Sequence, residues 1–182
     1  MKKIKTFIKD LYVIEPQVFN DDRGYFMESF KNNWFKSEFP EIEFVQDNES
    51  KSDYGVLRGL HFQIPPYSQT KLVRVICGEV LDVVVDLRKN SNSYGKYFSI
   101  KLSDKNKKQL LVPKGFAHGF IVLSNSAVFS YKVDNVYSKE HDSGVLCNDE
   151  DLNINWLIEK KSILISKKDQ SLKPFNKLIS PF

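Results

Sequence analysis

The sequence predicts an all-β fold, built as a double-sheet sandwich or barrel. Short apolar runs recur about every ten residues along the 182-residue chain, with turn signals between them. Hydrophobic residues make up 41% and charged residues 27%, close to globular averages, which excludes a disordered or fibrous protein. A chain of this length can bury a sizeable core without disulfide bonds, so we expect one domain over residues 1–182.

The elements follow from alternation and from turn residues, taken in chain order. Alternating or apolar runs predict strands, and the polar cluster Asn20–Gly24 separates the first two of them. Helical signal is weak, with room for two turns at Asn33–Phe39, and Ser103–Lys108 is a polar turn. Gly78 lies between two apolar runs and predicts a hairpin there. The expected strands are Tyr12–Phe19, Tyr25–Phe30, Phe44–Gln46, Val56–Gln63, Leu72–Ile76, Val80–Leu87, Tyr97–Leu102, Leu110–Val112, Ala117–Leu123, Val128–Val136 and Ile163–Ser166.

Charge and cysteine content exclude several classes of protein. The net charge is +4, but the lysines are spread along the chain, so we expect no nucleic-acid partner. No stretch approaches the roughly 18 apolar residues of a membrane span, and the lysine-rich start is not followed by the apolar run of a signal peptide. Cys77 and Cys147 are too few for a disulfide framework and lack metal-ligand spacing. A reducing, cytoplasmic location fits this pattern best.

Asp82 lies on one face of a strand whose other face is apolar, because Val83, Val85 and Leu87 alternate with it. If the Asp82 face points into the barrel, this carboxylate needs a partner, since a buried unpaired charge is costly. Lys71 on the preceding strand is the candidate partner, and a solvent-facing Asp82 is the alternative.

Three stretches concentrate glycine, histidine, arginine and aromatic residues: Leu57–Gln63, Pro113–Phe120 and Phe129–Lys132. A single histidine in a strand is more often a satisfied core group than a catalyst. Here His61 and His118, two of only three histidines, lie beside glycines, which permit close approach of a ligand or of another backbone. The third, His141, is expected to be a solvated loop residue.

The stretch from Gly55 to His61 and the stretch Pro113–His118 resemble the two motifs of the cupin superfamily, a jelly-roll double-sheet β-barrel. Metal-binding cupins usually carry His-x-His followed by a glutamate. This chain has His61-Phe62-Gln63 and no glutamate before Lys71. Two imidazoles match zinc or non-haem iron sites poorly, so the resemblance implies a cupin without its metal. A metal-dependent cupin oxygenase or isomerase is the alternative.

The chain resembles the dTDP-4-dehydrorhamnose 3,5-epimerases over nearly its whole length. The segments that carry this resemblance are Asp22–Glu28, Gln46–Asn48, Gly55–Gln63, Lys71–Val75, Gly78–Val80, Asp86–Arg88, Pro113–Phe120, Tyr131–Lys132 and Leu164–Asp169. The resemblance implies an isomerase of rhamnose and polysaccharide biosynthesis that needs no cofactor. It inverts C3 and C5 of dTDP-4-dehydro-6-deoxy-D-glucose through an enolate, which gives dTDP-4-dehydro-L-rhamnose. It also implies a homodimer, in which the early hairpin reaches the neighbouring subunit's pocket.

The resemblance assigns four catalytic roles. His61 is the base, and imidazole suits this task because it titrates near neutral pH. Asp169 orients the imidazole, although the sequence alone makes it merely an exposed carboxylate. Tyr131 is the acid on the opposite face, where without the resemblance it reads as a barrel-wall aromatic. Lys71 stabilises the enolate oxygen.

The other residues suit a nucleotide-linked sugar. Arg23 and Arg58 can clamp the diphosphate, Glu28 can accept a hydrogen bond from the pyrimidine N–H, and Tyr137 can stack on the base. Phe116 and Phe120 are expected to wall the pocket. Asp142 stands where the family usually has a glutamate, which puts that substrate contact in doubt. The substrate-binding set implied is Arg23, Phe26, Glu28, Gln46, Asn48, Arg58, His118, Tyr137, Asp142 and Lys168.

Strict strand alternation places Arg58 and His61 on opposite faces. If both line the pocket, the strand must be irregular, and we expect a bulge at Gly59. Two other functions stay open at this point. One is a relative that inverts only one carbon or uses another nucleotide-linked 4-keto sugar. The other is a non-catalytic sugar-binding cupin, which would have no use for His61, Asp169, Lys71 and Tyr131 together.

Overall fold

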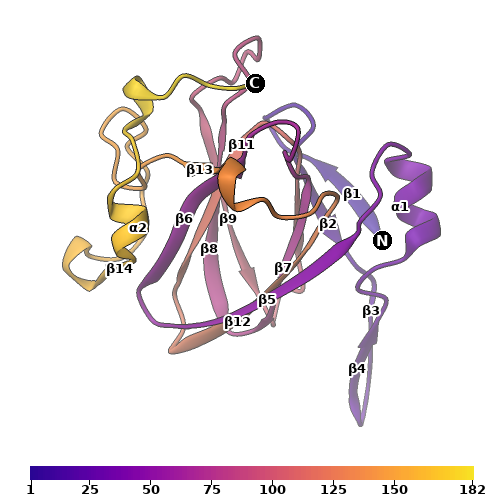
Figure 1. Cartoon of the computed structure of the whole chain (residues 1–182). Coiled ribbons are helices and arrows are strands. Elements are labelled where there is room, and N and C mark those ends of the chain that lie inside the picture. Colours follow the sequence, from indigo (N-terminus) through magenta and orange to yellow (C-terminus); the bar gives the residue numbers. More distant parts are fainter.

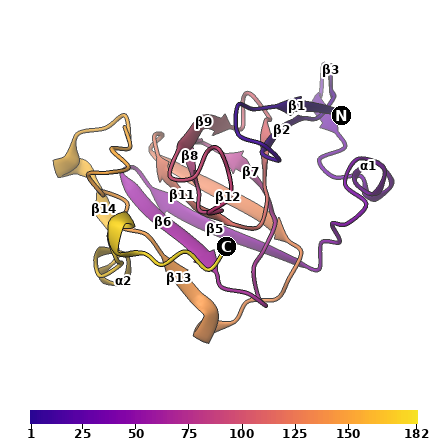
Figure 2. The same ribbon diagram turned by 90° about the horizontal axis from the view of Figure 1, so that it is seen from above.

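The computed structural model describes residues 1–182 as two β-sheets that face each other, with a separate hairpin and a few short helices (Figures 1 and 2). The first sheet has the order β1 (Lys2–Lys5), β2 (Tyr12–Glu15), β10 (Gln109–Val112), β7 (Lys71–Cys77), β12 (Ser126–Val133) and β5 (Gln46–Asp53). The second sheet has the order β13 (Asp142–Gly144), β6 (Val56–Gln63), β11 (Phe116–Val122), β8 (Glu79–Asp86) and β9 (Tyr97–Ser103), and β14 (Leu164–Ile165) runs parallel to β6. The predicted all-β double-sheet barrel is confirmed.

Three apolar clusters hold these layers together. The largest lies between the sheets and includes Val73, Val84 and Phe129. A second covers the outer face of the second sheet, where Val83 packs with residues of the C-terminal third such as Trp156. The third lies beneath helix α1 (Asn32–Glu38) on the outer face of the first sheet. Because β8 is buried on both faces, it reads in the sequence as an almost continuous apolar run.

The predicted hairpin at Gly78 is wrong. β7 belongs to the first sheet and β8 to the second, and the two strands do not pair. Gly78 instead marks the corner where the chain passes from one sheet to the other. Its φ is +84°, and a Cβ there would collide with the Ser126 carbonyl. A glycine between two apolar runs indicates a sharp turn, but it does not say whether the runs pair with each other or with other strands.

Strand boundaries differ from the prediction where polarity hides a strand or proline interrupts one. β5 runs to Asp53 rather than ending at Gln46, because it is an edge strand whose outward side chains are charged. The expected strand Tyr12–Phe19 divides at Pro16-Gln17 into β2 and β3 (Val18–Asp21). The helix expected at Asn33–Phe39 is confirmed to within one residue as α1.

The hairpin of β3 and β4 (Gly24–Met27) projects away from the two sheets (Figure 1). Three aromatic side chains on it, Phe19, Tyr25 and Phe26, are 52–67% exposed. The Lys107 ammonium lies 3.8 Å from the centre of the Tyr25 ring. A hairpin that leaves so much aromatic surface in solvent is typical of a segment that contacts another molecule.

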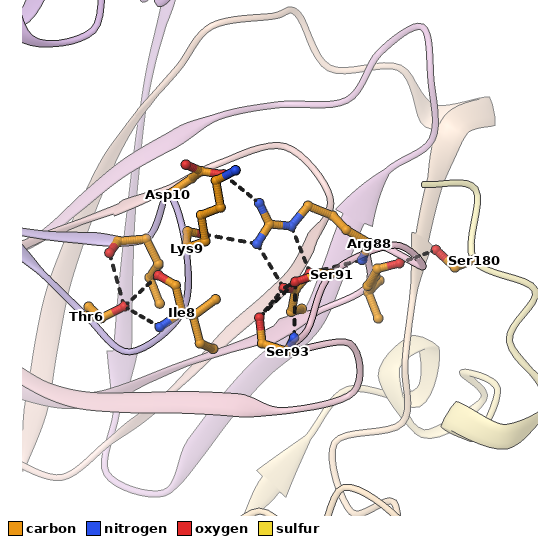
Figure 3. Close-up of polar contacts among 11 residues, drawn as sticks. Thr6, Ile8, Lys9, Asp10, Arg88, Ser91, Ser93 and Ser180 are labelled. Atoms are coloured by element: carbon orange, nitrogen blue, oxygen red, sulfur yellow. Dashed lines mark hydrogen bonds and ion pairs between the residues drawn. The ribbon is translucent and has the colours of Figure 1, made fainter.

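Arg88 joins the end of β8 to the N-terminal loop (Figure 3). Its guanidinium donates to Asp86, which is fully buried, and to Asp10. Burial by itself would raise the pKa of the Asp86 carboxyl, but hydrogen bonds from Arg88, Ser91 and Ser93 bring this pKa below its usual value. Arg88 also lies 4.6 Å from the ring of Phe116, a buried residue of the apolar cluster between the sheets. None of the helices is long and apolar enough to cross a membrane.

Candidate active site

A cavity of about 570 Å³ opens between the sheets and brings together half of the predicted site residues. The second sheet contributes Arg58, His61 and His118, and the first contributes Lys71 and Tyr131. Helix α2 (Lys167–Gln170) adds Lys168 and Asp169. The predicted wall residue Phe120 also lines the cavity, whereas Phe116 does not, so that prediction was wrong for Phe116.

The bulge expected at Gly59 is confirmed. In the pairing of β6 with β11, His61 lies opposite His118 and Arg58 opposite Phe120, so two residues of β6 oppose the single residue Gly119. The φ of Gly59 is +131°, and a Cβ there would lie 2.6 Å from the Gly119 Cα. Glycine at both positions lets the strands approach, and the extra residue turns Arg58 and His61 to the same cavity.

His61 and Asp169 form a hydrogen-bonded pair across more than a hundred residues of sequence. The Nε2–H of His61 donates to Oδ1 of Asp169 at 2.8 Å, and the backbone N–H of Gly59 donates to Oδ2 at 3.3 Å. Ser166 caps α2 by accepting from the Asp169 backbone N–H at 3.1 Å. Asp169 is 4% exposed, so it is not the exposed carboxylate that the sequence alone suggested.

The protonation state of Asp169 decides which imidazole nitrogen is basic. Burial would raise the pKa of this carboxyl, but the hydrogen bond and charge of His61 and the Gly59 N–H bring it below its usual value. Asp169 is therefore ionised near neutral pH and accepts from Nε2–H. The lone pair of the neutral ring is then on Nδ1, which makes no hydrogen bond to the protein.

Asp82 points inward and is fully buried, but its partner is His118 and not Lys71. His118 Nε2 lies 2.9 and 3.1 Å from the two Asp82 oxygens, and its ring stacks on Phe129. The pairing of Asp82 with Lys71 was therefore wrong, as was the solvent-facing alternative. Asp82 pairs with His118 because β11 lies next to β8 in the second sheet. His118 is opposite Val84, two residues along β8 from Asp82, so the two side chains lie diagonally on the same face.

Lys71 and Tyr131 face the cavity from the first sheet with shifted acidities. Burial lowers the pKa of the Lys71 ammonium to about 8, although the charges of Asp142 and Asp82 oppose this shift. Burial raises the pKa of the Tyr131 hydroxyl, and the positive charge of Arg58 acts against this shift. At neutral pH the cavity thus holds a charged ammonium and a protonated phenol.

A hydrogen bond to Ser52 fixes the guanidinium of Arg58. Its Nε–H donates to the hydroxyl of Ser52, which is 7% exposed, at 2.9 Å. This bond leaves both terminal amino groups of the guanidinium available for an anion in the cavity. Ser52 lies on β5, most of which was not predicted because its sequence is polar.

Five of the other predicted substrate-binding residues lie outside this cavity. Arg23 pairs with Asp21 at 2.6 Å and Glu28 with Lys31 at 2.9 Å, all on or next to the projecting hairpin. Phe26 is 67% exposed on the same hairpin. On β5, Gln46 donates to Asn48 at 2.8 Å, and neither lines the cavity.

Tyr137 and Asp142 lie beside the cavity rather than on its wall. The Tyr137 hydroxyl donates to Asp142 at 3.1 Å, and Lys168, which does line the cavity, forms an ion pair with the same carboxylate. His141 belongs to this loop, where it contacts Ser138 and the ring of Tyr67 and is half-buried. It lies outside the cavity. The expectation of a fully solvated residue was wrong, because the His141 side chain packs against its neighbours.

The sequence analysis did not predict four residues that support the site: Ser52, Gln63, Asp82 and Ser166. Ser166 was detectable, because Ser166-Lys167-Lys168-Asp169 has the Ser-x-x-Asp spacing of a helix N-cap. The partners of Ser52 and Gln63 depend on contacts between distant segments, and no local pattern signals them. No group of three or more His, Cys, Asp and Glu side chains is placed to hold a metal ion.

A carboxylate-oriented imidazole on one wall of a cavity, with a phenol and an ammonium on the other, is typical of a barrel enzyme that works by general acid–base catalysis. The comparisons agree and are more specific. A family model described as dTDP-4-dehydrorhamnose 3,5-epimerase matches residues 5–177. The chain belongs to the dTDP-4-dehydrorhamnose 3,5-epimerase family, and its barrel is of the cupin type.

Individual relatives cover almost the whole chain. A dTDP-4-dehydrorhamnose 3,5-epimerase from Shigella flexneri is 52% identical over 170 residues, 93% of each protein. The crystal structure of a dTDP-4-dehydrorhamnose 3,5-epimerase from Elizabethkingia anophelis NUHP1 has a TM-score of 0.92 and 52% identity, and 97% of each chain is covered. A dTDP-6-deoxy-D-glucose-3,5-epimerase from Legionella pneumophila Philadelphia 1, solved in complex with dTDP-4-keto-L-rhamnose, has a TM-score of 0.93 and 42% identity over 97% of this chain and 94% of that one.

Proposed function

We propose that this protein inverts C3 and C5 of dTDP-4-dehydro-6-deoxy-D-glucose to give dTDP-4-dehydro-L-rhamnose, without a cofactor. The single observation that carries this proposal is the arrangement of three groups around one cavity. The His61–Asp169 pair lies on one wall, and Tyr131 lies on the opposite sheet. The family membership of the chain supports the same reaction.

The chemistry follows from the ketone at C4, which acidifies the hydrogens on C3 and C5. Nδ1 of His61 removes these protons one at a time, and Asp169 stabilises the imidazolium formed in each step. Electrons from the broken C–H bond form the enolate, whose oxygen receives a hydrogen bond from the Lys71 ammonium. Tyr131 then donates its proton to the opposite face of the carbon, which inverts that centre. Exchange with water returns His61 and Tyr131 to their starting protonation states.

Substrate binding would use the charged groups around the cavity. The guanidinium of Arg58, fixed by Ser52, suits the diphosphate. Lys168 and His118 also line the cavity and would contact other oxygens of the substrate. Tyr137 is 53% exposed, as a residue that stacks on the base must be before the nucleotide arrives.

Proton exchange with heavy water tests this function directly. When the protein is incubated with dTDP-4-dehydro-6-deoxy-D-glucose in D₂O, NMR is expected to show deuterium at both C3 and C5. Exchange at one carbon only would favour the single-carbon epimerase that the sequence left open. An absence of exchange at either carbon, in protein that still binds dTDP, would contradict the proposed reaction and favour a sugar-binding cupin.

Replacing Tyr131 with Phe separates proton removal from inversion. We expect Tyr131→Phe to retain exchange at the carbons that His61 deprotonates, because the base and Lys71 are intact, while inversion slows by about 10²-fold. Parallel measurement of deuterium incorporation and product formation by NMR checks this. If the variant inverts both carbons at the wild-type rate, Tyr131 is not the acid.

We further propose that the enzyme acts as a homodimer whose subunits complete each other's sites. Arg23, Phe26 and Glu28 are implied to bind substrate, yet all three lie on or beside a projecting, exposed hairpin outside the cavity of their own chain. A second copy related by two-fold symmetry would allow each hairpin to reach the partner's cavity.

A mixing experiment tests this shared site. His61→Ala and Arg23→Ala chains are each expected to form nearly inactive dimers. When the two are unfolded and refolded together in equal amounts, half of the dimers are mixed, and each mixed dimer contains one intact site. Activity is then expected to recover to about a quarter of the wild-type value. A mixture no more active than its components would rule out a site shared between subunits.

Two further assignments accompany this proposal. Residues 1–182 would form one domain, since the cavity wall draws on segments from Glu49 to Asp169. The location would be cytoplasmic. Cys77 is an exposed free thiol and Cys147 a buried one, a state typical of reducing compartments.

A further inference from the structure

We propose that Gln63 is a positioning residue that fixes the loop from Tyr137 to Asp142 and thereby sets the affinity of the enzyme for the nucleotide part of its substrate. This inference rests on the proposed function, because it takes Tyr137 and Asp142 as substrate contacts. It assigns a role to a buried side chain in the site that the chemistry itself does not use.

Gln63 is the last residue of β6 and lies two positions beyond His61, so both side chains project from the same side of the strand. It is 4% exposed, and both ends of its amide are occupied by the loop. Its Oε1 accepts from the backbone N–H of Ser138 at 2.9 Å, and its Nε2 donates to Oδ1 of Asp142 at 3.3 Å. One side chain therefore holds the loop at its beginning and at its end.

Asp142 links Gln63 to the exposed side chain of Tyr137. Its side chain is 12% exposed and accepts from three groups: the Gln63 amide, the Tyr137 hydroxyl at 3.1 Å and the Lys168 ammonium. The Tyr137 side chain makes no other hydrogen bond, and about half of it is exposed. The position of the Tyr137 ring thus depends on Asp142, and the position of Asp142 depends on Gln63.

A merely structural glutamine would behave differently. Gln63 shares β6 with His61, so a variant that disturbed the strand would misplace the base and lower kcat. A variant that frees only the loop would weaken nucleotide binding and leave the chemistry at His61, Lys71 and Tyr131 intact. The split between dTDP affinity and kcat therefore separates the two roles.

Gln63→Glu is the sharpest single test, because it keeps the size of the side chain and the acceptor for Ser138. It removes the donor to Asp142 and places two carboxylates against each other. We expect the Kd for dTDP, measured by calorimetry, to rise about 5- to 100-fold, the range that follows from losing a buried hydrogen-bond partner. At saturating substrate kcat is expected to stay close to wild type. The matched control is Asn106→Asp, the same amide-to-acid change in the turn between β9 and β10.

A second background tests whether Gln63 acts through Asp142. In the double variant Gln63→Glu/Asp142→Asn the acid and the amide have exchanged places. The amide at position 142 can then donate to the carboxylate at position 63, which restores the hydrogen bond in the reverse direction. Adding Gln63→Glu to Asp142→Asn is expected to cost far less dTDP affinity than adding it to wild type. Equal costs in the two backgrounds would overturn the proposal.

Two other results would also overturn it. One is an unchanged dTDP affinity in Gln63→Glu. The other is a fall in kcat with unchanged dTDP affinity, which would place Gln63 with the base. Failure of the proposed function looks different, since wild-type protein would then show no C3 or C5 exchange whatever the Gln63 variants do.

Discussion

His61→Ala is expected to abolish exchange of the C3 and C5 hydrogens with D₂O and to lower kcat/KM by at least about 10³-fold. In both imidazoles of the cavity Nε2 is paired with a carboxylate and Nδ1 has no hydrogen bond to the protein. The His61 side chain is 31% exposed and that of His118 only 7%, so His61 is the imidazole that a substrate in the cavity reaches. NMR of the recovered sugar nucleotide measures exchange, and a coupled assay measures turnover.

Binding and chemical rescue make this result interpretable. The variant should bind dTDP with wild-type affinity, since Arg58 is proposed to bind the diphosphate and Tyr137 to stack on the thymine ring. Added imidazole should restore part of the exchange, because truncation to alanine leaves space beside Asp169. If His61→Ala retains exchange at wild-type rates, another group removes the protons and the assignment of the base fails.

Much of the barrel follows from local pattern. Alternation in β6, β11 and β12 predicted strands that the structure contains, and the need to place Arg58 and His61 in one cavity predicted the bulge at Gly59. The strands were accessible from the spacing of side chains along the chain. The bulge also required the family resemblance, which implied that Arg58 and His61 share a pocket although alternation places them on opposite faces.

The features that the sequence analysis did not predict depend on which strands become neighbours in the sheets. The partner of Asp82 is His118 because β11 lies beside β8, and the strands flanking Gly78 enter different sheets. Ser52 lies on an edge strand that is too polar for its pattern to reveal it. A sequence taken residue by residue gives the faces of strands, whereas sheet order is decided by long-range packing.

The alkaline limb of the pH profile provides the other large expected effect, and it depends on Lys71. In the proposed reaction its ammonium is the form that stabilises the enolate oxygen, and its pKa is about 8 because burial outweighs the charges of Asp142 and Asp82. As pH rises through about 8 the ammonium is lost, so kcat/KM should fall. Tyr131 does not explain a limb at this pH, because burial raises the pKa of its hydroxyl above the ordinary tyrosine value.

Two substitutions isolate the charge. Lys71→Met preserves most of the side-chain volume but removes the ammonium, and kcat should drop about 10²–10³-fold with little change in dTDP affinity. Lys71→Arg keeps a positive charge to much higher pH, because guanidinium stays protonated. Its residual activity should therefore lack the alkaline limb near pH 8. If that limb persists unchanged in Lys71→Arg, the titrating group is not Lys71, and the enolate oxygen must be stabilised by another donor in the cavity.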